Sequence, residues 1–181
     1  TLEVLQMKML KKMAALLLAG VMALALLTAC GDEAPAKSAA EQAEDAMFIA
    51  FNQAIGTEFK NDEAMKNVAR KAITDNVGED GKVVNGKIFG ADQEKNMMWV
   101  IYPDVDHEGT ALGITAEQVA QLKDPKFAQD LAQDMVNTFG KDTLEAMKKT
   151  IEVMGVGAVT KNGKTYIAIA VTLKATAAQP Q

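Results

Sequence analysis

The residue types that most often perform catalysis are scarce in this chain. It has one cysteine (Cys30), one histidine (His107) and one serine (Ser38). A nucleophilic serine or cysteine needs a base within hydrogen-bonding distance, and Ser38 lies among small and polar residues where nothing would orient one. A zinc site that needs two or three His or Cys ligands is not expected either. These counts argue against serine, cysteine and zinc chemistry.

Carboxylates are the remaining groups that could act in catalysis or bind a metal. Two carboxylates can cleave a glycosidic bond, but no pair stands out among the 24 Asp and Glu residues. The one local cluster is Asp104, Asp106 and Glu108, which alternate before a glycine as in the first half of a calcium loop. The twelfth position is Thr115 instead of glutamate. The cluster is therefore either a weak calcium site or an acidic, solvated loop, in which we expect His107 to be exposed.

The position of the only cysteine indicates a processing signal. The segment Met13–Leu27 is apolar and uncharged, and three lysines lie between residues 8 and 12. A basic segment, a short apolar segment and a small-residue cleavage site define a secretory signal peptide. The apolar segment is shorter than the roughly 20 residues that span a membrane as a helix. The four residues Leu27-Thr28-Ala29-Cys30 resemble the lipobox of bacterial lipoproteins.

This resemblance implies an address and an anchor. In lipoproteins the cysteine thiol is joined to a diacylglycerol and the chain is cut before the cysteine, so that Cys30 would become the first residue of an extracytoplasmic, membrane-anchored protein. Each buried lipid CH₂ contributes about 0.8 kcal/mol, so two or three acyl chains hold a protein stably whereas one does not. The alternative is a general secretory signal in which the cysteine occurs by chance. A disulfide within the chain is excluded, because Cys30 has no second cysteine to pair with.

Charge and composition restrict the partners. Without residues 1–29, the chain has 16 Lys or Arg and 23 Asp or Glu residues and a net charge of −7. Nucleic acid selects clustered Lys and Arg, and Arg70 is the only arginine. We therefore expect no nucleic-acid partner and no phosphate clamp of several arginines. No cofactor is expected either.

Composition also divides the chain into segments. We expect residues 1–29 to contain a few upstream residues and the signal peptide. Residues 30–43 lack large apolar side chains after the cysteine and predict a flexible tether. The composition of residues 44–174 predicts a single domain, and that of residues 175–181 predicts a disordered tail. A chain of about 150 residues buries roughly 70% of its unfolded surface, so one core can hold this domain without disulfides.

The first half of the domain predicts helices followed by two strands. A helical stripe ends near Gly56, and Asn61 or Asp62 can cap a second stretch that stops near Asn76. The run Met97–Tyr102 predicts a strand, with a turn before it. Its Trp99 and Tyr102 could line a binding face, although core packing is the simpler interpretation. The first stripe consists of Met47, Phe48, Phe51, Ile55 and Phe59.

The second half predicts two or three helices and a closing hairpin. Thr115 and Gln118 match the capping-box pattern, as do Asp142 and Glu145, and Asp124-Pro125 is typical of a helix start. On the last helix we expect Leu144, Met147, Ile151 and Met154 to face inward.

The hairpin is the clearest local signal. It centres on Asn162-Gly163, the preferred pair for a type I′ turn. After it, Ile167, Ile169, Val171 and Leu173 alternate with smaller residues and should pack on the helices. Ala168 and Ala170 should tolerate serine unless a second layer covers them.

Together these elements predict an α+β fold, with an antiparallel sheet of about four strands packed against helices. The order is one or two helices, two strands, two or three helices and two strands. The function we expect is that of a lipid-anchored, non-catalytic binding or accessory domain of the bacterial cell envelope. Its partner would be an envelope protein, a wall polymer or a small ligand. The alternative is a carboxylate-dependent enzyme that acts on a cell-wall glycan.

Overall fold

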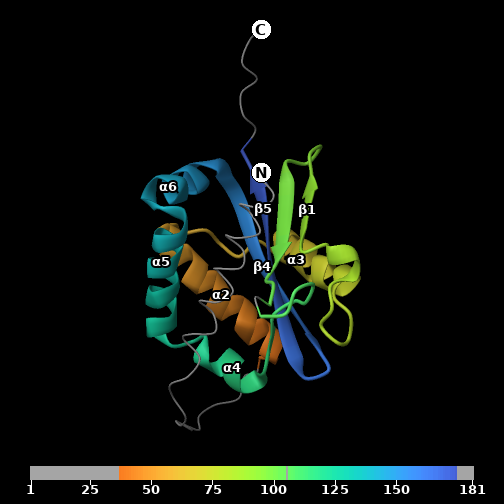
Figure 1. Ribbon diagram of the computed structural model, residues 1–181. Helices are drawn as coiled ribbons and strands as arrows, with labels where there is room; N and C mark the ends of the chain where they lie inside the picture. The colour runs from red at the N-terminus through yellow and green to blue at the C-terminus, as the bar shows by residue number, and fades with distance from the viewer. Residues whose placement is uncertain (1–36, 105, 175–181) are drawn as a thin grey trace.

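The computed structural model describes residues 37–104 and 106–174. Within them the chain forms five α-helices and a five-stranded antiparallel sheet (Figure 1), which confirms the predicted α+β class. The helices are α2 (Ala39–Ile55), α3 (Glu63–Asn76), α4 (Ala116–Gln121), α5 (Pro125–Phe139) and α6 (Lys141–Thr150). The strands are β1 (Phe89–Asp92), β2 (Met97–Ile101), β3 (Gly113–Ile114), β4 (Ile151–Lys161) and β5 (Lys164–Leu173), and a short 3₁₀ turn (Val84–Gly86) precedes β1.

Strand β5 lies at the centre of the sheet. It pairs with β4 on one side and with both β2 and β3 on the other, and β1 pairs with β2. The predicted hairpin is confirmed: Asn162 and Gly163 have φ values of 46° and 74°, as a type I′ turn requires, and Lys161 pairs with Lys164. Within the described residues the outer strands of this sheet are therefore β1, β3 and β4.

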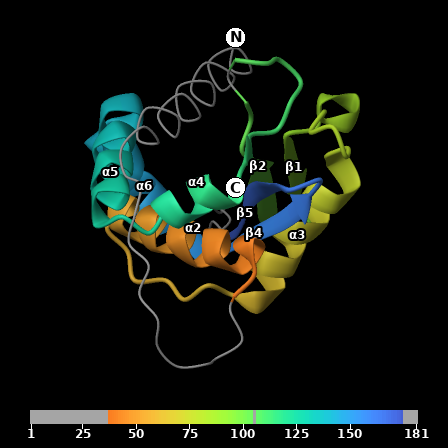
Figure 2. The ribbon, with the colours of Figure 1, turned by 90° about the horizontal axis from the view of Figure 1, so that it is seen from below.

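Helices cover the sheet on both faces. Helices α2, α4, α5 and α6 contribute to one core, and α3 packs on the opposite face (Figures 1 and 2). Ile167, Ile169 and Val171 enter the first core, which confirms the orientation predicted for β5. Ala168 and Ala170 enter the second core and are fully buried, because α3 forms the second layer that the prediction of serine tolerance named as its exception.

Two glycines allow α3 to lie directly against β4. A Cβ atom on Gly155 would come within 2.4 Å of the Lys66 amide nitrogen, and one on Gly157 within 2.5 Å of the Lys66 carbonyl oxygen. No real Cβ contact is that short, so β4 needs glycine at both positions for this close approach. Together with the alanines of β5, they give this face of the sheet a surface of small residues.

The first helix begins earlier than predicted. Helix α2 starts at Ala39, and Ser38 and Glu41 form a reciprocal capping box at its N-terminus. Ala43 is fully buried, so residues 39–43 belong to the domain and not to the tether. Small residues alone do not imply disorder when alanine, the best helix former, is the small residue.

The last helix and β4 also differ from the prediction. Helix α6 starts after Gly140 without a side-chain cap, so Asp142 and Glu145 do not form the predicted capping box. Asp142 lies in the first turn, where a negative charge favours the helix dipole. Strand β4 begins at Ile151, so Ile151 and Met154 reach the core from a strand instead of a helix.

Candidate functional site

The predicted site residues fall in two places. Cys30 lies outside the described residues. Asp104 accepts a hydrogen bond from the Asp106 amide (3.0 Å) and lies 2.9 Å from His107 Nδ1. The side chain of His107 is 73% exposed, as expected, and Asp106 and Glu108 are exposed as well.

This loop shows no assembled calcium site. Asp104 is engaged in a local turn of the kind that Asp side chains stabilise. Among residues 37–104 and 106–174, no group of three or more His, Cys, Asp or Glu side chains is placed to hold a metal ion. Calcium binding by Asp104, Asp106 and Glu108 stays a prediction that gains no support from the geometry.

The two aromatic residues of the β2 run pack against the cores. Tyr102 is buried in the larger core, and its hydroxyl has no hydrogen-bond partner. Burial raises the pKa of Tyr102 well above its usual value. Trp99 is half-buried and lies against Gly90, where a Cβ atom would come within 2.4 Å of the indole ring. Both residues therefore have a packing role.

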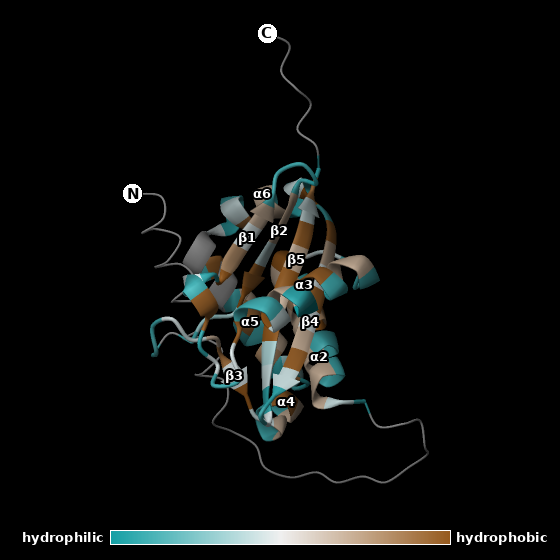
Figure 3. Cartoon of the chain, turned by 90° about the vertical axis from the view of Figure 1, so that its right-hand side faces the viewer, coloured by the Kyte–Doolittle hydropathy of each residue, from teal (hydrophilic) through white to brown (hydrophobic). Residues whose placement is uncertain are grey.

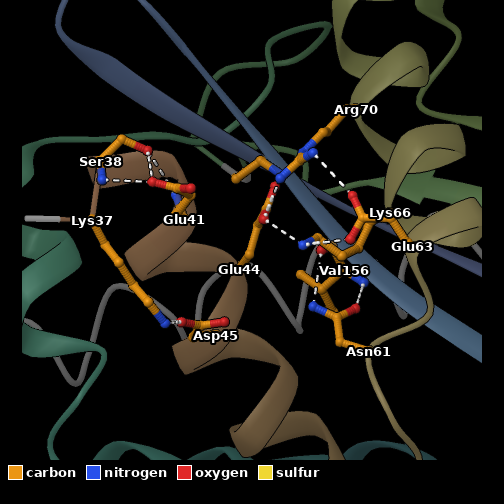
Figure 4. A network of polar contacts seen from close by, with 11 residues as sticks. Lys37, Ser38, Glu41, Glu44, Asp45, Asn61, Glu63, Lys66, Arg70 and Val156 are labelled. Carbon is orange, nitrogen blue, oxygen red and sulfur yellow. Dashed lines mark hydrogen bonds and ion pairs between the residues drawn. The ribbon is translucent and has the colours of Figure 1, made fainter. Parts of the chain in front are cut away.

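A charge cluster centred on the buried Glu44 joins α2 and α3 and contacts the backbone of β4 (Figure 4). The Glu44 side chain is 1% exposed, and Arg70 donates to both of its oxygens, from Nε at 2.6 Å and from an Nη at 2.7 Å. Lys66 lies 3.5 Å from the same carboxylate and 3.1 Å from Glu63. The bidentate bond to Glu44 holds the pKa of Arg70 above its ordinary value.

Glu44 of this cluster, together with the neighbouring Asn61 and Asp62, satisfies the backbone groups along the free edge of β4. The Ala158 amide donates to Glu44 Oε1 at 2.8 Å. The Asn61 side chain accepts from the Val156 amide at 2.9 Å and donates to the Val156 carbonyl at 3.5 Å, and the Asp62 amide donates to the Met154 carbonyl at 3.0 Å. An unpaired strand edge can template aggregation, and covering it is a common protection. Glu44 is therefore structural, and both of its oxygens are already occupied.

Sequence reasoning missed this cluster, although one signal pointed to it. Glu44 precedes Met47 and Phe51 at helical spacing, so it lies on the apolar stripe of α2. A charged residue on a buried stripe needs a partner, and Arg70 is the only arginine in the chain. The predicted domain began at residue 44, so Glu44 stood at its border with the predicted tether and was not considered as a core position.

The opposite edge of the sheet is exposed. Phe89 on β1 is 48% exposed, and Met98 and Val100 on β2 are only partly buried against the larger core. Figure 3 shows hydrophobic residues along the strands on this side of the molecule, whereas much of the helix surface is hydrophilic. Phe89 is the one exposed large hydrophobic side chain on β1 and β2, and residues exposed singly in this way are normal on a protein surface.

Comparisons of the chain with protein-family models, with curated proteins and with solved structures find no significant match. In the part of the chain that the structure describes, every helix is too short or too polar to span a bilayer.

Proposed function

We propose that this protein is a bacterial lipoprotein, held outside the cytoplasm by lipid on Cys30, with a folded domain that binds a partner in the cell envelope. One observation carries the anchor: the only cysteine follows Leu27-Thr28-Ala29 at the end of a basic and then apolar segment. The domain supplies an α+β scaffold behind that anchor.

The start of α2 limits how far the domain can lie from the anchor. Ser38 already caps the first helix, so residues 30–37 are the whole link between the lipidated residue and the domain. Eight residues reach at most about 29 Å when fully extended. Under this proposal the domain acts close to the membrane surface and selects partners that are also there.

The scarce nucleophile candidates have other roles, which supports binding over catalysis. The Ser38 hydroxyl accepts from the Glu41 amide as the cap of α2. His107 lies in an exposed loop with Asp104 as its neighbour. The best-buried carboxylate, on Glu44, is fully engaged by Arg70 and Ala158.

The anchor is tested by metabolic labelling with an alkyne fatty acid in a bacterial host. The wild-type chain should incorporate the label and fractionate with membranes, and Cys30→Ser should abolish both. A matched control, Cys30→Ser combined with Ala34→Cys, keeps one thiol four residues away and should stay unlabelled. Labelling of either variant, or a soluble and unlabelled wild type, would contradict the anchor.

The binding role is tested separately with the membrane-extracted chain. It is incubated at micromolar concentration with envelope proteins and with purified wall polymer. A specific, saturable partner supports the proposal. Absence of any such partner, together with turnover of a wall glycan, would favour the enzyme alternative.

A further inference from the structure

The dipeptide Asn-Gly occurs twice in the chain, and both copies lie in turns. They are Asn85-Gly86, in the short 3₁₀ turn before β1, and Asn162-Gly163, in the turn of the β4–β5 hairpin. Asparagine before glycine is prone to lose its side-chain amide, because glycine has no Cβ to hinder attack by its own backbone nitrogen. Each pair is followed by lysine. A difference in reactivity between the two would therefore report on the fold.

The turn at Asn85 is held weakly. Val84, Asn85, Gly86 and Lys87 are all exposed. The two backbone hydrogen bonds that span Asn85 run from the Gly86 amide to the Val83 carbonyl and from the Lys87 amide to the Val84 carbonyl. Both are 3.3 Å long, which exceeds the usual range. Opening of this turn therefore uncovers no buried side chain and breaks only long hydrogen bonds.

The turn at Asn162 is held at several points. The side-chain amide of Asn162 donates to the Glu79 carbonyl at 3.0 Å, and the Lys161 ammonium donates to the Val77 carbonyl at 2.5 Å. Lys161 also pairs with Lys164 at the end of the ladder between β4 and β5. Opening here would break these contacts and fray the central hairpin of the sheet, so it costs more free energy than opening the exposed turn.

We propose that Asn85 is a spontaneous modification site, at which water converts the side-chain amide to a carboxylate, and that the fold protects Asn162 from the same reaction. The Gly86 nitrogen bonds to Cγ of Asn85 and loses its proton, while the side-chain nitrogen leaves as ammonia. Water then opens the resulting succinimide at either carbonyl and gives aspartate or isoaspartate. At the observed ψ of 20° the Gly86 nitrogen points away from the Asn85 side chain, so the reaction requires the turn to open.

The reaction changes both the charge and the backbone of this segment. It adds a negative charge to a chain whose net charge is already negative. Isoaspartate also inserts a methylene into the backbone shortly before Ile88, whose carbonyl accepts from the Ile101 amide at 2.8 Å. The modified fraction grows with the age of the protein molecule. The inference goes beyond the proposed function, since the reaction needs water alone and neither a lipid on Cys30 nor a partner.

The proposal is tested by peptide mapping of the full chain after incubation in heavy-oxygen water, which labels only the carboxylates formed during the assay. At mildly alkaline pH the native chain should convert Asn85 at least about tenfold faster than Asn162, because opening the hairpin breaks more hydrogen bonds. In guanidinium chloride the two rates should agree within about a factor of two, because the fold is lost. Equal native rates, a faster reaction at Asn162, or a native Asn85 that does not react while the unfolded chain does, would overturn the proposal.

Two variants test the site and its protected counterpart separately. Asn85→Gln keeps an amide but places it one carbon farther from the backbone, so it should abolish the label at position 85 with an unchanged melting temperature. Lys161→Ala removes the bond to the Val77 carbonyl and should raise the rate at Asn162 several-fold while Asn85 reacts as before. If Lys161→Ala does not fold, the ratio of native to unfolded rates in the wild type decides. Wild-type labelling in Asn85→Gln, or an unchanged Asn162 rate in folded Lys161→Ala, would overturn the assignment.

Discussion

Replacing either partner of the Glu44–Arg70 pair should reduce stability strongly and unequally. Arg70→Ala leaves a carboxylate that is 1% exposed with only the Ala158 amide and a Lys66 ammonium 3.5 Å away. Breaking a buried ion pair in this way costs about 3–5 kcal/mol. Glu44→Ala leaves Arg70, whose side chain is 33% exposed and can reach water, so we expect the lower end, about 3 kcal/mol, including the unpaired Ala158 amide.

The assay is urea unfolding of wild type, both single variants and the double variant. With an m-value of about 2 kcal/mol/M, a loss of 3 kcal/mol lowers the midpoint by about 1.5 M. The double variant should lose clearly less than the sum of the two single losses, because the partners contact each other. Glu44→Gln keeps an acceptor for Ala158 and should cost less than Glu44→Ala. Additive losses, or a loss below about 1 kcal/mol for Arg70→Ala, would refute the structural role of the pair.

Three further predictions follow from the described contacts. Gly157→Ala should destabilise the domain by about 3 kcal/mol in urea unfolding, because the added Cβ meets the α3 backbone; a neutral result would mean that α3 lies farther from β4. Tyr102→Phe should stabilise it by about 1 kcal/mol, because the unpartnered hydroxyl is removed. Burial raises the pKa of Tyr102, so the wild type should lose stability as the pH rises above 10 and the variant should lose less; a destabilised variant would reveal a partner for the hydroxyl. The Ser38 amide lowers the pKa of Glu41 below its usual 4.5, so its contribution is present above that pH and is lost on acidification. Melting temperatures of Glu41→Gln should therefore fall less steeply below pH 4.5, and identical slopes would contradict this.

Local signals in the sequence predicted most of the elements. Asp62 caps α3, Thr115 and Gln118 form their capping box, Asp124 caps α5, and the hairpin turns at Asn162. Each of these depends on contacts within a few residues, which the sequence displays directly.

The early start of α2 at the Ser38–Glu41 capping box is a local signal that the small residues around it obscured, whereas other misses depend on tertiary contacts. Ile151 and Met154 have helical spacing, but pairing with β5 makes this segment a strand. Gly155 and Gly157 do not indicate a strand until α3 is placed against them. The second core under Ala168 likewise depends on where α3 packs. The sequence signals a buried charge at Glu44, but its partner at Ala158 is 114 residues away. The role of Cys30 depends on processing and not on packing, so the fold neither supports nor opposes it.

The most direct test of the central claim is the intact mass of the protein extracted from bacterial membranes. We predict a chain that begins at Cys30 and carries the added mass of a diacylglycerol, with or without an amide-linked acyl chain. Fragmentation should place the whole addition on the first residue. A chain that begins elsewhere, or one that begins at Cys30 with a free thiol, would contradict the lipoprotein assignment.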